Sequence, residues 1–299
     1  QPHVHEMKGA LVKAGYPEER ARKLTNLAGR DLNGLLRIIR GLSVYPDWAT
    51  QTHAGELAIA QFISQWEEEN LGDREAVEEL SGKAYGEWIA KIRKIASAQA
   101  APLEFAIGRW KFTSRYEPWI YLGELLGVDE LERFGHLAIK VLSEPDPKLE
   151  LPNEKRPAAG LYGKGRKYSN RLREGIAATL AMLGAHGEAL KSVASGKSQL
   201  VASQVVRDVL KGADAHHWAS LTDVLPLLAE AAPDVFLSAV GGASETHDKP
   251  FSGVFTQESD GVFGHNYITG LLWALESLAW SDQYFSRVCD ILANLAEID

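Results

Sequence analysis

Residues 73–113 decide the fold class. Their first part reads Asp73-Arg-Glu-Ala-Val-Glu-Glu-Leu-Ser-Gly82, which predicts a helix that begins at Asp73 and ends at Gly82. The second part reads Lys83-Ala-Tyr-Gly-Glu-Trp-Ile-Ala-Lys-Ile-Arg-Lys-Ile95, and its apolar spacings of three and four predict another helix. The third part reads Pro102-Leu-Glu-Phe-Ala-Ile-Gly-Arg-Trp-Lys-Phe-Thr113, and its apolar period of two predicts two strands joined at Gly108-Arg109. This order indicates a winged helix.

The rest of the chain predicts a mainly α fold whose only strands are those at 103–113. Four prolines between residues 144 and 157 exclude regular structure there, and short antiparallel helix pairs follow. Helix pairs stacked in series suggest an α-solenoid, although no clean period repeats. The four predicted regions are a helical lid-like unit (1–50), the winged helix (51–123), a bridging helix with a proline-rich linker (124–157) and a helical-repeat domain (158–299).

Size and composition favour a cytoplasmic protein of two or three folding units. The chain has 299 residues, 45% of them hydrophobic, and a formal net charge of -8. This charge argues against a protein that coats nucleic acid, although a local basic face is compatible with it. No apolar stretch approaches the roughly 20 residues that cross a bilayer, and the start is no signal peptide. The chain opens at Gln1 without methionine, so we expect a piece of a longer protein.

Several residue types have ordinary structural interpretations. The single cysteine, Cys289, lies in an apolar helical pattern and is expected to be a buried thiol. The histidines have no partner at ligand spacing, so we expect no metal site. Trp88 and Trp110 are expected in the winged-helix core, and Trp273 and Trp280 in the core of the last helical hairpin. The acidic run at 66–70 is expected to be a solvated helix end.

The run Gly196-Lys197-Ser198 has the last three residues of a phosphate-binding loop. Such a loop also needs a glycine five positions earlier, where this chain has Lys191, and a buried strand before it. The preceding segment is instead alanine-rich and helical in pattern. We therefore expect a polar loop between helices and no nucleotide site.

A glycine-rich and aromatic loop at 251–264 has two interpretations. Its phenylalanines can pack beneath the helices, because aromatic side chains tend to be buried. Long loops also often have a function, and an exposed loop here would be a recognition site for a protein partner. The residues that would then anchor the partner are Phe251, Phe255 and Phe263.

A helical unit with Gly29-Arg30-Asp31-Leu32 before its last helix, then a winged helix and helical repeats, resembles the segment after the nucleotide-binding core in STAND-type NTPases of the AAA+ superclass. The resemblance extends over nearly the whole chain. Stretches similar to those of large bacterial ATP-binding proteins with this layout are Leu131-Glu-Arg-Phe134, Leu161-Tyr-Gly-Lys164, Leu172-Arg-Glu-Gly175 and Gly270-Leu-Leu-Trp-Ala-Leu-Glu276.

The resemblance implies a regulatory and sensor fragment of an ATP-driven switch in bacterial defence or signalling. Residues 5–48 would be the lid, the winged helix would relay the nucleotide state, and the helical repeats would bind a protein ligand. Arg30 falls where the superclass often places an arginine toward the γ-phosphate. Walker A and Walker B segments are both missing, so we expect no ATP hydrolysis by this chain alone. ATP binding and self-association are implied for the full-length protein.

A second hypothesis is a winged-helix transcriptional regulator with a helical effector domain. Its phosphate contacts would come from the cations of the second helix and the hairpin. Apolar residues occupy much of the recognition helix, however, and five cations over two elements are typical of an ordinary surface. An enzyme acting alone ranks third. The five cations are Lys91, Arg93, Lys94, Arg109 and Lys111.

Overall fold

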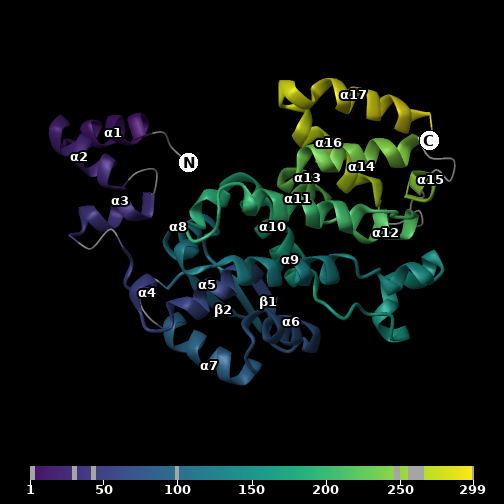
Figure 1. Cartoon of the computed structure of the whole chain (residues 1–299), viewed down its shortest axis with the longest axis horizontal. Helices are drawn as coiled ribbons and strands as arrows, with labels where there is room; N and C mark the ends of the chain where they lie inside the picture. Colours follow the sequence, from purple (N-terminus) through teal and green to yellow (C-terminus); the bar gives the residue numbers. More distant parts are fainter. Residues whose placement is uncertain are drawn as a thin grey trace.

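The computed structural model describes residues 4–28, 32–41, 45–97, 101–245, 250–254 and 266–297 (Figure 1). These residues form mainly helices and one three-stranded antiparallel sheet, which confirms the mainly α class. No helix within these ranges is long and apolar enough to cross a membrane.

The first helices form a unit with a hydrophobic core of its own. They are α1 (Val4–Lys13), α2 (Glu18–Ala28) and α3 (Leu32–Ile39), and they lie to one side of the other helices in Figure 1. The next helix, α4 (Asp47–Thr50), buries Trp48 in the main core of the chain. The separate core contains Met7, Leu11, Ala21, Leu24, Ala28 and Leu35.

The next elements follow the order of a winged helix: helix, strand, two helices and two strands. The predicted hairpin is present, with Leu103 paired to Phe112 and Ala106 to Arg109. A third strand joins it, so the strand order is β1-β3-β2. The elements are α5 (Ala54–Ile63), β1 (Gln65–Glu67), α6 (Leu71–Ser81), α7 (Tyr85–Ala96), β2 (Leu103–Ala106) and β3 (Arg109–Phe112).

Strand β1 overturns the expectation of a solvated helix end at residues 66–70. Helix α5 ends at Ile63, and Ser64 adopts a left-handed conformation with φ 64° that redirects the chain. Trp66 then pairs with Trp110 across the sheet and is fully buried. The start of α6 also differs from the prediction, because Asn70 caps this helix by accepting from the Asp73 N–H.

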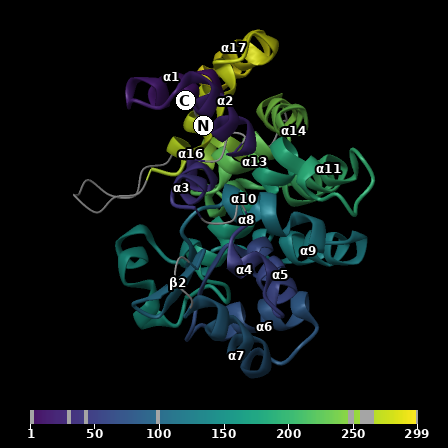
Figure 2. The ribbon, with the colours of Figure 1, turned by 90° about the vertical axis from the view of Figure 1, so that its left-hand side faces the viewer.

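The remaining helices stack in two layers, and the stack includes the winged helix. In one layer α5, α10, α13 and α16 contact one another in that order, and in the other layer α6, α9, α11, α14 and α17 do so. Figures 1 and 2 show this stack from α7 at one end to α17 at the other. The elements are α8 (Tyr116–Leu122), α9 (Val128–Leu142), α10 (Asn170–His186), α11 (Lys197–Leu210), α12 (Ala215–Ser220), α13 (Leu225–Ala231), α14 (Pro233–Glu245), α15 (Pro250–Val254), α16 (Ile268–Ala279) and α17 (Asp282–Ala296).

The regions predicted as bridge and linker have defined structure. The predicted bridging helix is α9, which is part of the second layer. The proline-rich segment contains a short 3-10 helix, Pro147–Glu150, and a stretch of 3-10 turns, Asn153–Tyr162, that is interrupted by a kink at Ala158, so the expectation of no regular structure is wrong. Proline is compatible with these turns because its ring fixes φ near the helical value.

The burial of the tryptophans and the cysteine was predicted only in part. Trp88 and Trp110 are buried, as expected for the winged-helix core. The expectation for Trp273 and Trp280 is wrong, because the side chain of Trp273 in α16 is 61% exposed and that of Trp280, directly after this helix, is 85% exposed. Cys289 is also exposed rather than buried.

Candidate functional site

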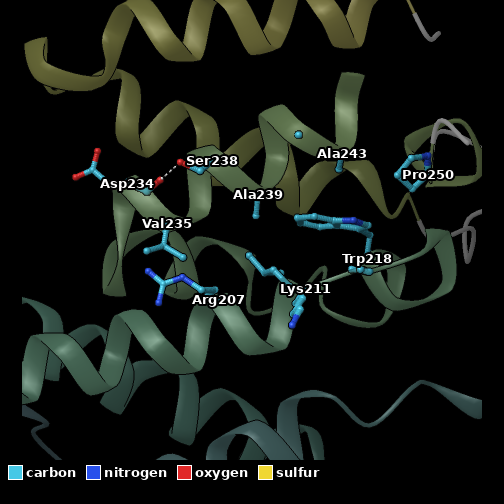
Figure 3. Close-up of a pocket in the computed structure, with 13 residues that line it drawn as sticks. Arg207, Lys211, Trp218, Asp234, Val235, Ser238, Ala239, Ala243 and Pro250 are labelled. Carbon is cyan, nitrogen blue, oxygen red and sulfur yellow. Dashed lines mark hydrogen bonds between the residues drawn. The ribbon is translucent and has the colours of Figure 1, made fainter. Parts of the chain in front are cut away.

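An apolar pocket of about 750 Å³ opens between α11, α12 and α14 (Figure 3). Its size is within the range of small-molecule binding sites in proteins. Its lining residues include Arg207, Leu210, Lys211, Ala213, Trp218, Asp234, Val235, Ser238, Ala239, Gly242, Ala243 and Pro250.

The pocket exists because the side chains that α14 presents to it are small. Phe236, Leu237 and Val240 on one of its faces are buried in the main core. The residues toward the pocket recur at spacings of three and four and are small, so this second face does not fill the space beside it. They are Val235, Ser238, Ala239, Gly242 and Ala243.

Trp218 forms the opposite wall. Asp214 caps α12 by accepting from the His217 N–H across 2.8 Å, and this short helix positions the indole below Ala243, reaching toward Ala239 (Figure 3). The side chain is 1% exposed and packs against Phe251, with 5.0 Å between ring centroids. Its buried Nε1 has no hydrogen-bond partner among the described residues.

Two cations lie along one edge of the pocket, on the last turn of α11. Arg207 donates a hydrogen bond to the Gln204 amide oxygen across 3.1 Å, and neither Arg207 nor Lys211 is paired with a carboxylate in the described part of the chain. On the other edge, Asp234 is paired with Arg287 at 2.9 Å. The pocket therefore combines an apolar interior with a cationic edge.

Of the residues predicted as partner anchors, only Phe251 lies in the described part of the chain. Phe251 is fully buried against Trp218, whereas the prediction required an exposed ring. Its burial favours the alternative interpretation, in which this part of the loop packs beneath the helices. Phe255 and Phe263 lie outside the described residues, as does Arg30.

The predicted nucleic-acid cations are mostly engaged with carboxylates. Lys91 contacts Glu87 and Glu56 at 2.8 and 3.6 Å, and Arg93 contacts Glu68 at 3.0 Å. Arg109 faces Glu67 at 3.8 Å across β1 and β3. Lys94 and Lys111 are exposed. Binding of nucleic acid by these residues stays a prediction, but most of the positive charge is already balanced.

Lys197 has no surroundings typical of a phosphate-binding loop. It begins α11 and forms an ion pair with Glu132 at 2.9 Å, and the preceding segment is a short 3-10 helix, Gly187–Ala189, followed by turns. Among the described residues, no group of three side chains is arranged to hold a metal ion.

Neither a family model, nor a curated protein, nor a solved structure matches this chain. Its functional interpretation therefore depends on the residues and geometry above. The small side chains of α14 are the one sequence signal of the pocket, and they are also typical of close helix packing. The positions of Trp218 and the two cations relative to that helix depend on the tertiary structure.

Proposed function

We propose that the chain is the regulatory and sensor part of a STAND-type, ATP-driven switch in bacterial defence or signalling. It works in the cytoplasm through protein contacts. The nucleotide-binding core belongs to the rest of the full-length protein. The single observation that most supports the proposal is the separation of α1–α3 from a continuous stack that joins the winged helix to the helical repeats.

The stack and the unit α1–α3 differ in the size of their hydrophobic cores. The stack has one continuous hydrophobic core from Trp48 to Leu295, so the winged helix and the repeats move together. The unit α1–α3 has only its own small core. A small unit beside a large rigid one is typical of a switch in which two bodies change their relative position.

An ion pair joins the two parts. Arg37 of α3 donates a hydrogen bond to Glu117 of α8, and its guanidinium lies 5.7 Å from the centre of the Tyr121 ring. Both charged side chains are largely buried, with 16% and 10% of their surfaces exposed. Removal of one partner takes a charge-assisted hydrogen bond away from the other, largely buried charge, which is unfavourable. This contact therefore holds α1–α3 against the stack.

The experiment measures the distance between the two parts with paired labels. Cys289 of α17 is exposed and is the single cysteine of the chain, so Lys13→Cys in α1 supplies a second label. We expect Arg37→Glu to widen the distribution of label distances and the exchange Arg37→Glu with Glu117→Arg to narrow it again. Arg40→Glu is the matched control, because Arg40 is exposed on the same unit. An unchanged distribution in Arg37→Glu would contradict the two-part switch.

Two binding measurements test the other classes of function. We expect millimolar ATP to leave the melting temperature unchanged, and a rise abolished by Lys197→Ala would instead indicate a nucleotide site in this chain. We also expect no salt-sensitive binding to duplex DNA. Such binding, if lost on replacement of Lys91, Arg93 and Lys94 by Gln, would favour the transcriptional regulator.

A further inference from the structure

We propose that the pocket between α11, α12 and α14 binds an amphipathic organic anion. An aromatic or aliphatic body lies against Trp218 and α14, and the anionic group meets Arg207 and Lys211. This inference rests on the proposed function in one respect, because it names the kind of small molecule that the sensor part would detect. The binding itself is independent of the switch.

The interior of the pocket selects the body of the ligand. Leu210, Ala213, Val235 and Ala239 offer apolar surface, and the Trp218 indole offers a flat aromatic edge beneath α14 (Figure 3). Burial of apolar surface is the main source of affinity in such pockets. A strongly polar ligand, such as a sugar, would find too few partners here.

The edge of the pocket selects the charge. Arg207, in the last turn of α11, and Lys211, directly after it, line the same edge, and neither forms an ion pair with a carboxylate of the described chain. The one acidic residue in the lining, Asp234, is already paired with Arg287. An anion is therefore attracted to the α11 edge and is not repelled by a free carboxylate at the other edge.

Gly242 provides a way to close the pocket without damage to the fold. A Cβ added there would meet no atom within 4 Å, and Gly242 lies inside α14. Leucine is a better helix former than glycine, so Gly242→Leu should fold at least as well as the native chain. Gly86 of α7 is the matched control, because it is also helical, exposed and free of neighbours within 4 Å.

The probes are a matched pair of dyes that fluoresce in apolar surroundings. The first is 1-anilinonaphthalene-8-sulfonate, an amphipathic anion, and the second is N-phenyl-1-naphthylamine, which has the same rings without the sulfonate. The protein is the whole chain, and an unchanged near-ultraviolet circular dichroism spectrum shows that each variant is folded. We expect saturable binding of both dyes to the native chain.

The variants separate the two halves of the proposal. Gly242→Leu should lower the affinity for both dyes by at least about tenfold, since the leucine side chain occupies the apolar space. Gly86→Leu should leave the affinity for both dyes unchanged. Replacement of both Arg207 and Lys211 by Gln should lower the affinity for the sulfonate dye by about twofold to fivefold, the range of an exposed ion pair. The affinity for the neutral dye should stay unchanged. Lys94→Gln, the charge control, should change neither dye.

Three results would overturn the inference. If Gly242→Leu binds the dyes as well as the native chain, the pocket is not the site. If replacement of Arg207 and Lys211 lowers the affinity for the neutral dye as much as that for the sulfonate dye, the site does not select anions. If neither dye saturates on the folded native chain, no such site exists. Saturable binding with no change in the distance between the Lys13→Cys and Cys289 labels would leave the site in place and contradict the sensor function instead.

Discussion

The Asp73 carboxylate in α6 is hydrogen-bonded to Ser169, the residue that caps α10. The Ser169 hydroxyl donates to Oδ2 across 2.6 Å, and the Ser169 N–H donates to Oδ1 across 2.9 Å. The same hydroxyl accepts from the Leu172 N–H across 3.0 Å, which satisfies the first turn of α10. One buried serine therefore both begins a helix of the repeat domain and fixes it to the winged helix.

Replacement of Ser169 by alanine tests this double role. Ser169→Ala removes the cap and one partner of a fully buried carboxylate, so we expect the free energy of unfolding to fall by about 1–2 kcal/mol. Ser281→Ala is the control, because Ser281 precedes α17 but makes no side-chain capping bond. It should change the free energy by less than about 0.5 kcal/mol. Urea denaturation measures both, and equal effects would contradict the role of Ser169.

The ionisation of Asp73 should make this junction sensitive to pH. Burial raises the pKa of Asp73 above its usual value, and the hydrogen bonds from Ser169 and Glu67 oppose this only in part. The folded chain then holds this proton more tightly than the unfolded chain. The stabilisation from Asp73 is thus complete below the unfolded pKa of 3.8 and is lost as pH rises through the higher folded pKa.

Comparison with Asp73→Asn isolates this group, because other carboxyl groups titrate equally in both proteins. We expect the stability of the native chain minus that of Asp73→Asn to decrease as pH rises through this window. Urea denaturation at a series of pH values measures the difference. A difference that increases with pH would show that the hydrogen bonds outweigh burial and that the pKa is lowered.

The adjacent residues Glu68 and Glu69 have different surroundings, so their replacement by alanine should change the free energy of unfolding by different amounts. Glu68 is 7% exposed and accepts from the Tyr85 hydroxyl across 3.0 Å, from Arg93 across 3.0 Å and from the Trp110 indole N–H. Glu68→Ala leaves buried donors without a partner, so we expect a loss of about 2–4 kcal/mol. The side chain of Glu69 is 86% exposed, and Glu69→Ala should cost less than about 0.5 kcal/mol. Similar losses in the two variants would contradict the buried network.

The hairpin turn should become more stable with asparagine at its first position. Ile107 and Gly108 have φ values of 51° and 72°, which are both left-handed, as a two-residue type I′ turn requires. Ile107 is 96% exposed, so its side chain gains little from packing and its branched Cβ is strained. Ile107→Asn should raise the free energy of unfolding by about 0.5–1 kcal/mol. Ile107→Val keeps the branch and should give no gain, so a gain in both variants would contradict this reason.

The winged helix was predictable because its local patterns agree with its tertiary contacts. The period-two run at 103–113 forms the hairpin, and Trp88 and Trp110 are buried as their spacing indicated. The turn lies one residue earlier than predicted, at Ile107-Gly108. The sequence did not predict this position because isoleucine is rare at positive φ. Strand β1 was missed because the run of glutamates that begins at its last residue, Glu67, is typical of an exposed segment. Only the tertiary structure shows the buried partners of the next residue, Glu68.

The candidate site was less predictable than the fold. The phenylalanine loop was predicted as a possible partner site because long loops often have a function, yet the Phe251 ring is buried beside Trp218. The pocket depends instead on small residues of α14, and small residues pack closely as often as they leave space. Trp273 was assigned to the core because it is large and aromatic, although the stripe of buried residues on α16 excludes it. That stripe is Ile268, Leu271, Leu275 and Leu278, and it leaves Trp273 on the face with Glu276 and Ser277.

The continuity of the stack should depend on Gly175, where α10 meets the end of α5. A Cβ at Gly175 would overlap the main-chain oxygen of Ile63, so the two helices could not approach as closely. Alanine normally favours a helix by about 1 kcal/mol over glycine, but here we expect Gly175→Ala to destabilise the chain by roughly 1–3 kcal/mol. Gly86→Ala, with no atom within 4 Å of the added Cβ, should instead stabilise it by about 0.5–1 kcal/mol. Opposite signs in urea denaturation would support the close contact, whereas stabilisation by both substitutions would show that α10 and α5 can separate without cost.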